Sequence, residues 1–188
     1  MSYKSNFWEL IKLIVLAVVI IVPTRYFLVQ PFFVRGASME PTFFDGEYLI
    51  IDELSYSLRQ PDRGEVIVFR YPLSPSQFYI KRIIGLPGDT VWIDQGHVVI
   101  QNATHPDGVI LNEAEYLPEG VRTGGESTKT VLDKDQYFVL GDNREVSSDS
   151  RSWGILPRSN IIGRVWIRAY PVGRLNIFSV PRAGFLNI

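Results

Sequence analysis

The sequence contains no cysteine, and this absence excludes disulfide bonds, thiolate catalysis and cysteine-ligated metals. Histidine is scarce as well. His97 and His105 lie in a stretch punctuated by glycine and proline without a nearby metal-ligand pattern, so we interpret them as solvated loop residues rather than metal ligands. The net charge of -1 supplies no basic field of the kind that nucleic-acid binding needs. Neither a cysteine-based metal site nor a nucleic-acid partner is therefore expected.

The longest charge-free stretch lies near the N-terminus. Residues 13–24 read LIVLAVVIIVPT, and twelve residues alone are too few to span a bilayer. Because the long side chains of Lys12 and Arg25 can reach toward the membrane surfaces, residues 8–28 attain about bilayer length. A removable signal peptide and a buried core helix are the alternatives. We predict that residues 1–30 form an uncleaved membrane anchor, whose orientation the nearby charges do not determine.

The remainder, residues 31–188, predicts a mostly β, antiparallel body. Short runs rich in Val, Ile, Phe and Tyr alternate with turn clusters, and one helical turn is expected around residues 54–58. Residues 94–134 are richer in Gly, Asn, Thr and Glu, which indicates a smaller subdomain inserted between core strands. The predicted strands are EYLIID, GEVIVF, FYIKRIIG, TVWID, HVVIQ, QYFVL and IIGRVWIRAYP.

One serine follows the apolar segment directly. The stretch RGASMEPTFFDG, residues 35–46, sets Ser38 among small residues before a Met-Glu-Pro turn. A serine needs a base to become a nucleophile, arginine cannot deprotonate, and neither histidine has a motif around it. Of the five lysines, Lys81 lies in an apolar strand, where burial would lower the pKa of its amine toward that of a general base. The alternative is that Lys81 simply faces solvent on a surface strand.

A third polar motif, GDNREVSSDSRSWG, occupies residues 141–154 after the predicted strand QYFVL. It carries Ser147, Asp149 and Arg151, and pairing between an aspartate and an arginine can fix such a loop through charge-assisted hydrogen bonds. Taken alone, the motif is equally compatible with an ordinary hairpin loop.

Together these motifs resemble those of type I signal peptidases, a family of serine proteases with a Ser/Lys dyad. They occur in the family's order behind an N-terminal membrane segment, and the resemblance covers essentially the whole chain except that residues 94–134 match least. The matching pieces are SMEPT at 38–42, GEYLIIDELSY at 46–56, RGEVIVF at 63–69, YIKRIIGLPGD at 79–89 and GDNREVSSDSRSWG at 141–154.

The resemblance implies roles for individual residues. Ser38 matches the nucleophile and Lys81 the general base of a mechanism that passes through an acyl-enzyme and needs no metal or cofactor. Ser147 matches a hydroxyl that orients the lysine amine. Asp149 and Arg151 match a salt bridge that supports the site.

The resemblance also implies how substrate binds. In some family members a serine two positions before the nucleophile supplies a second oxyanion donor, and here Gly36 occupies that position. The family binds its substrate as an added strand, which segments 32–36 and 78–81 should flank. Shallow pockets would admit small residues one and three positions before the cut, which gives small-x-small cleavage sites. The residues expected to shape substrate binding are Phe32, Val34, Met39, Tyr79 and Ile80.

The implied partners are signal peptides of exported preproteins and the lipid bilayer. The body would lie on the extracytoplasmic side of the plasma membrane as a monomer, with Phe32, Phe33 and residues 176–186 contributing to a membrane-facing hydrophobic surface. Self-cleaving repressors have a similar fold and dyad but need a DNA-binding domain, which residues 1–30 do not supply. The remaining alternative is a catalytically inactive, membrane-tethered β module that binds peptides.

Overall fold

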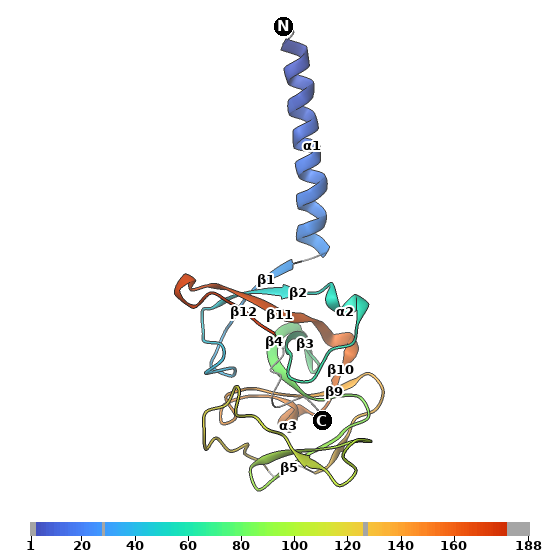
Figure 1. Ribbon diagram of the computed structural model, residues 1–188, viewed down its shortest axis with the longest axis vertical. Helices are drawn as coiled ribbons and strands as arrows, with labels where there is room; N and C mark the ends of the chain where they lie inside the picture. The colour runs from blue at the N-terminus through green and yellow to red at the C-terminus, as the bar shows by residue number, and fades with distance from the viewer. Residues whose placement is uncertain (1–2, 28, 126–127, 180–188) are drawn as a thin grey trace.

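The computed structural model describes residues 3–27, 29–125 and 128–179, so residues 180–186 of the predicted hydrophobic surface lie outside the described part of the chain. Helix α1 (Tyr3–Phe27) stands clear of a β-rich body, which Figure 1 shows at its C-terminal end. From Phe7 to Val19 nearly all of its side chains are exposed. Over the described ranges, no helix is both long enough and apolar enough to cross a membrane.

The larger sheet has the strand order β1-β2-β11-β3-β4-β9-β10, with β12 paired to β11, and every pair in it is antiparallel. Five of its strands, β2, β3, β4, β9 and β11, follow predicted apolar runs, while β1, β10 and β12 were not predicted. Its strands are β1 (Val29–Phe33), β2 (Tyr48–Asp52), β3 (Val66–Tyr71), β4 (Ser74–Gly85), β9 (Gln136–Leu140), β10 (Leu156–Pro157), β11 (Ile161–Tyr170) and β12 (Asn176–Ile177).

A second sheet of four antiparallel strands has the order β7-β6-β5-β8. A hydrophobic cluster joins it to the larger sheet, because Ile84 and Leu140 of that sheet pack with Val91 and Ile100 of this one. The strands are β5 (Thr90–Asp94), β6 (His97–Gln101), β7 (Val109–Ile110) and β8 (Thr130–Val131). They fall largely within residues 94–134, whose standing as a separate inserted subdomain stays a prediction.

Strand β3 shows why the larger sheet is buried on both faces. Its residues alternate between two hydrophobic clusters: Val66 and Val68 pack in one, and Ile67 and Phe69 in the other. A central strand that is covered on both sides reads as a continuous apolar run, as VIVF does in this sequence.

Strand β4 is longer than predicted. The segment YPLSPSQ was expected to be a turn, but the strand already begins at Ser74, opposite Tyr71, and an irregularity in the pairing accommodates the residues before Phe78. Strand β4 pairs with β3 from Phe78 onward, whereas its pairing with β9 begins only at Arg82. The stretch 78–81 therefore has one edge that no described strand occupies.

Short helical turns complete the body. The predicted turn near residues 54–58 is confirmed as α2 (Ser55–Leu58). Within the 141–154 motif, α3 (Ser150–Trp153) forms one helical turn where only a loop was predicted. Its first turn is stabilised by the Asp149 side chain, which accepts a hydrogen bond from the Arg151 amide. Two 3-10 turns are η1 (Arg158–Asn160) and η2 (Val172–Arg174).

Candidate active site

The structure brings Ser38 and Lys81 into direct contact. Lys81 Nζ donates a hydrogen bond to Ser38 Oγ at 2.7 Å and a second one to the carbonyl oxygen of Ile80, also at 2.7 Å. The lysine comes from β4 and the serine from the turn after β1, 43 residues earlier in the chain. Two donated hydrogen bonds restrict the flexible lysine side chain to one direction.

Lys81 has the environment of a general base. The residue is only 3% exposed, and burial lowers the pKa of its amine from 10.5 to about 8 because an ammonium ion loses its hydration there. The carboxylates of Asp149 and Asp142 act in the opposite direction and raise this pKa. About a tenth of the amine is therefore neutral at pH 7, far more than for an ordinary lysine, and the neutral form is the one that general-base catalysis requires.

Backbone hydrogen bonds hold the turn that carries Ser38. Val34 donates to the Glu47 carbonyl at 2.9 Å, and the Gly36 amide donates to Asp45 Oδ1 at 2.7 Å. Gly36 has a φ of 84°, a left-handed conformation that glycine adopts without a steric penalty. Met39 is fully buried in the core, so its side chain fixes the turn from the side opposite solvent.

The 141–149 loop packs directly on this turn. The Asn143 amide donates to the Ser38 carbonyl oxygen at 3.1 Å. A Cβ atom at Gly141 would collide with that same carbonyl and with Ser147 Oγ, so only glycine fits there. Ser147 thus lies near the Ser38 backbone, while its expected role in orienting the Lys81 amine stays a prediction. Its buried hydroxyl makes no hydrogen bond of standard geometry, and in particular none to Lys81.

Asp149 and Arg151 form the expected salt bridge. Arg151 Nε and Nη2 donate to the two carboxylate oxygens of Asp149 at 2.8 and 2.7 Å, and the Gly141 amide donates to Oδ2 at 3.0 Å. Burial alone would raise the pKa of Asp149, but the hydrogen bonds from Arg151 and Gly141 outweigh it, and the Ser147 hydroxyl adds to their effect. The pKa of Asp149 is therefore lowered, and the carboxylate stays ionised.

A second buried ion pair was not predicted. Arg82, the residue after Lys81, donates to both oxygens of Asp142 at 2.9 and 2.6 Å, and both side chains are buried. Thr42 donates its hydroxyl hydrogen bond to the same carboxylate at 2.5 Å. The pair therefore links β4, the 141–149 loop and the Ser38 turn. In the sequence, the position of Arg82 directly after Lys81 was the only sign that Arg82 belongs to the site.

A groove of about 910 Å³ opens in front of Ser38 and Lys81. Four of the five residues predicted to shape substrate binding line it, whereas the fifth, Met39, lies in the core instead. The sequence did not point to the contributions of Leu49, Val68, Val146 and Ser148. The predicted lining residues are Phe32, Val34, Tyr79 and Ile80, and Gly36 and Phe33 lie along the same groove.

The two histidines take no part in this arrangement. His97 opens β6, and its Nε2 lies 2.6 Å from a guanidinium nitrogen of Arg122. His105 lies in the loop between β6 and β7 and does not line the groove. Figure 1 shows the sheet that contains β5 at the end of the body remote from α1.

Comparisons with known proteins agree on one family. Residues 7–170 match the protein family described as "Signal peptidase, peptidase S26". The chain is 38% identical over 184 residues to "Probable signal peptidase I-2" of Synechocystis sp., a match that covers 95% of this chain and 80% of the relative. It is 33% identical over 181 residues to "Signal peptidase I P" of Bacillus subtilis subsp. natto, covering 92% and 94% of the two chains.

Among solved structures, the chain is similar to a signal peptidase I from Enterococcus faecalis. That match has 28% sequence identity and a TM-score of 0.44, and it covers 56% of this chain and 97% of the other.

Proposed function

The chain belongs to the signal peptidase family, peptidase S26, and we propose that it cleaves signal peptides from exported preproteins with a Ser/Lys dyad. One observation carries the dyad: Lys81 Nζ lies 2.7 Å from Ser38 Oγ, with the lysine buried and its pKa lowered to about 8. A neutral amine at hydrogen-bond distance is able to accept the hydroxyl proton that serine must lose.

The reaction proceeds in two halves. Lys81 accepts the proton of Ser38 Oγ as the oxygen attacks the scissile carbonyl carbon, and the ammonium then returns a proton to the leaving amine. The C–N bond breaks, and the signal peptide stays bound to Ser38 as an ester. In the second half, Lys81 removes a proton from water, the hydroxide attacks the ester, and Ser38 recovers its proton.

The 141–151 loop keeps this pair aligned. The Asp149–Arg151 salt bridge anchors the Gly141 amide, and Gly141 in turn touches both the Ser38 carbonyl and Ser147. In this proposal the Ser147 hydroxyl accepts a hydrogen bond from the Lys81 amine once substrate enters, and directs its lone pair toward Ser38. The position of that hydroxyl, buried beside Gly141 and the Ser38 carbonyl, supports the assignment.

The Ser38 amide is the proposed oxyanion donor. Gly36 has no hydroxyl to offer, and its own N–H already donates to Asp45, so Gly36 contributes by shaping the turn. The absence of a side chain there leaves the backbone open, with no atom within 4 Å of the place that a Cβ would take. This space allows a substrate backbone to approach closely.

Substrate binds as an added strand between two open edges. Among the described strands, β1 pairs only with β2, and residues 78–81 of β4 pair only with β3, so both segments offer backbone groups for pairing beside the groove. The apolar side chains of Phe32, Val34 and Ile80 line the groove where the proposed shallow pockets lie. Small residues at the positions one and three before the cut fit such pockets, which explains small-x-small cleavage sites.

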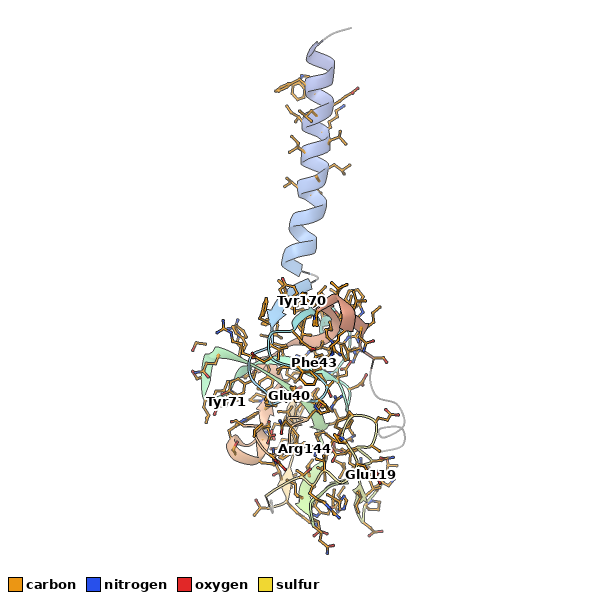
Figure 2. The ribbon with its side chains drawn as sticks, turned by 90° about the vertical axis from the view of Figure 1, so that its left-hand side faces the viewer. Glu40, Phe43, Tyr71, Glu119, Arg144 and Tyr170 are labelled. Atoms are coloured by element: carbon orange, nitrogen blue, oxygen red, sulfur yellow. The ribbon has the colours of Figure 1, made fainter. Side chains whose placement is uncertain are left out.

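Helix α1 serves as the membrane anchor of the body in this proposal. Its described apolar side chains are exposed, with Leu13 at 65% and Val19 at 60%, and no part of the body covers them. At the same end, Phe33 and Tyr170 are exposed, and Figure 2 shows Tyr170 next to the base of α1. The body then lies outside the plasma membrane. Protease added to intact spheroplasts should digest it, and full protection would reverse the orientation.

The proposed activity is tested with detergent-solubilised protein, a preprotein, and sequencing of the product N-termini. Wild type should cut after a small-x-small site, whereas Ser38→Ala and Lys81→Ala should give no product while remaining folded. A variant with both His97 and His105 changed to Ala is the control and should cleave normally. Cleavage by Ser38→Ala, or loss of activity in the folded histidine variant, would refute the dyad.

A further inference from the structure

Residues 111–124, between β7 and β8, reach back to the catalytic loop through buried polar contacts. The side chain of Arg144 has no exposed surface, so its positive charge needs a partner inside the protein. Glu113 supplies that partner: Arg144 Nη1 donates to Oε2 at 3.0 Å, and Nη2 donates to Oε1. The buried Thr123 hydroxyl accepts a further hydrogen bond from Nη1. Arg144, labelled in Figure 2, is buried in the body.

From Arg144 the contacts continue to the nucleophile. Arg144 Nε donates to the Gly141 carbonyl at 3.0 Å, which closes the turn 141–144. On its other side this turn meets the Ser38 backbone, through the Asn143 amide and through the close approach of Gly141. The carboxylate of Glu113 is thus connected to the Ser38 carbonyl through the Arg144 side chain and the backbone of the turn 141–144.

Glu113 also has a second path to the site. The Tyr116 hydroxyl donates to Glu113 Oε1 at 2.5 Å, and the Tyr116 ring lies under the guanidinium of Arg82, 4.1 Å from its central carbon. Arg82 follows Lys81 in β4 and pairs with Asp142. Glu113 therefore contacts Arg144, which closes the turn 141–144. It also contacts Tyr116, whose ring packs against Arg82 beside the general base.

We propose that Glu113 is a positioning residue for the peptidase reaction, which acts through Arg144 to keep the turn 141–144 against Ser38. This inference rests on the proposed function. Glu113 does not line the groove, so its effect should fall on the chemical step rather than on substrate binding. Residues 94–134 resemble the family least, so neither the motifs nor the predicted roles pointed to it.

Four variants test the proposal in the full-length, detergent-solubilised chain. Glu113→Gln keeps the shape and removes the charge, whereas Glu113→Asp keeps the charge and shortens the side chain. Glu119→Gln removes the same charge from an exposed position of the same segment and is the matched control, marked in Figure 2. Arg144→Met, alone and combined with Glu113→Gln, completes a double-mutant cycle.

The measurement is single-turnover cleavage of one preprotein with enzyme in excess, which gives a maximal rate and a half-saturating enzyme concentration. Glu113→Gln should lower the maximal rate at least tenfold and leave the half-saturating concentration within twofold. Glu119→Gln should match wild type. Because the effect of Glu113 is assigned to Arg144 and not to the Tyr116 contact, adding Glu113→Gln to Arg144→Met should change the rate by less than twofold. A merely structural role would reduce the folded fraction but would not produce this pattern.

Three outcomes overturn the inference: a wild-type rate in Glu113→Gln, an equal loss in Glu119→Gln, or a further large loss when Glu113→Gln is added to Arg144→Met. If Glu113→Gln does not fold, Glu113→Asp decides, since a displaced carboxylate should slow cleavage severalfold and a wild-type rate would refute the role. If the wild-type chain itself cleaves no preprotein, or Ser38→Ala cleaves it, the proposed function fails first, and these results tell the two failures apart.

Discussion

Replacing the buried lysine should stabilise the protein while it removes the activity. The pKa of Lys81 falls from its ordinary 10.5 to about 8 on burial, and this difference of about 2.5 corresponds to about 3.5 kcal/mol at about 1.4 kcal/mol per tenfold change. Lys81→Met removes that penalty at pH 7. It also loses two hydrogen bonds, to Ser38 and Ile80, worth about 1 kcal/mol each. A net stabilisation of about 1.5 kcal/mol remains, or about 5 °C in melting temperature.

The sign of this effect should reverse at high pH. The folded-state pKa is the lower one, so wild type carries the full penalty below about pH 8 and loses it as pH rises toward the unfolded value of 10.5. At pH 10 the penalty has fallen below about 1 kcal/mol, and the two lost hydrogen bonds then dominate. Lys81→Met should therefore be more stable than wild type at pH 7 and less stable at pH 10.

Urea unfolding of the full chain in detergent, followed by tryptophan fluorescence at both pH values, measures this difference. Lys134→Met is the matched control, because Lys134 is exposed and its loss removes the same charge without relieving any burial. If Lys81→Met destabilises the protein equally at pH 7 and pH 10, burial does not penalise the charged Lys81 amine, and the lowered pKa is wrong.

The remaining predictions concern turnover. Single-turnover cleavage should rise about tenfold per pH unit below the pKa of Lys81, about 8, and level off above it, because only the neutral amine accepts the Ser38 proton; a flat profile between pH 6 and 9 would contradict this. Ser147→Ala should slow the same reaction by roughly ten- to a thousandfold, and more than Ser148→Ala does; the reverse order would reassign the orienting hydroxyl. Gly141→Ala should abolish cleavage, because its Cβ would collide with the Ser38 carbonyl and Ser147. Normal turnover would show that the 141–149 loop can shift away from Ser38 without loss of activity.

Long apolar runs made most of the fold predictable. The seven predicted strands correspond to β2, β3, β4, β5, β6, β9 and β11, and the turn at α2 was also predicted. The strands β7, β8, β10 and β12 have two residues each, too few for an alternating pattern to show. Strand β1 contains Pro31, which argues against a central strand, but β1 lies at the sheet edge, where a missing N–H is tolerated.

The site was predictable only in part. Residue chemistry alone left Lys81 undecided between base and surface residue, and the family resemblance supplied the pairing with Ser38. The contacts of Arg144 with Glu113 could not be foreseen, because an ion pair between two loops 31 residues apart leaves no periodic trace in the sequence. Met39 was expected to shape a substrate pocket together with Val34 and Ile80, yet the turn directs its side chain into the core.

The central claim is that Ser38, activated by Lys81, forms a covalent acyl-enzyme with the signal peptide. The most direct measurement is acid quenching during preprotein turnover, followed by proteolytic digestion and mass spectrometry of the peptide that contains Ser38. This peptide should gain the mass of the signal-peptide fragment as an ester on Ser38, and Lys81→Ala should show no such gain. Cleavage without any adduct on Ser38, or an adduct on another residue, would show that Ser38 is not the nucleophile.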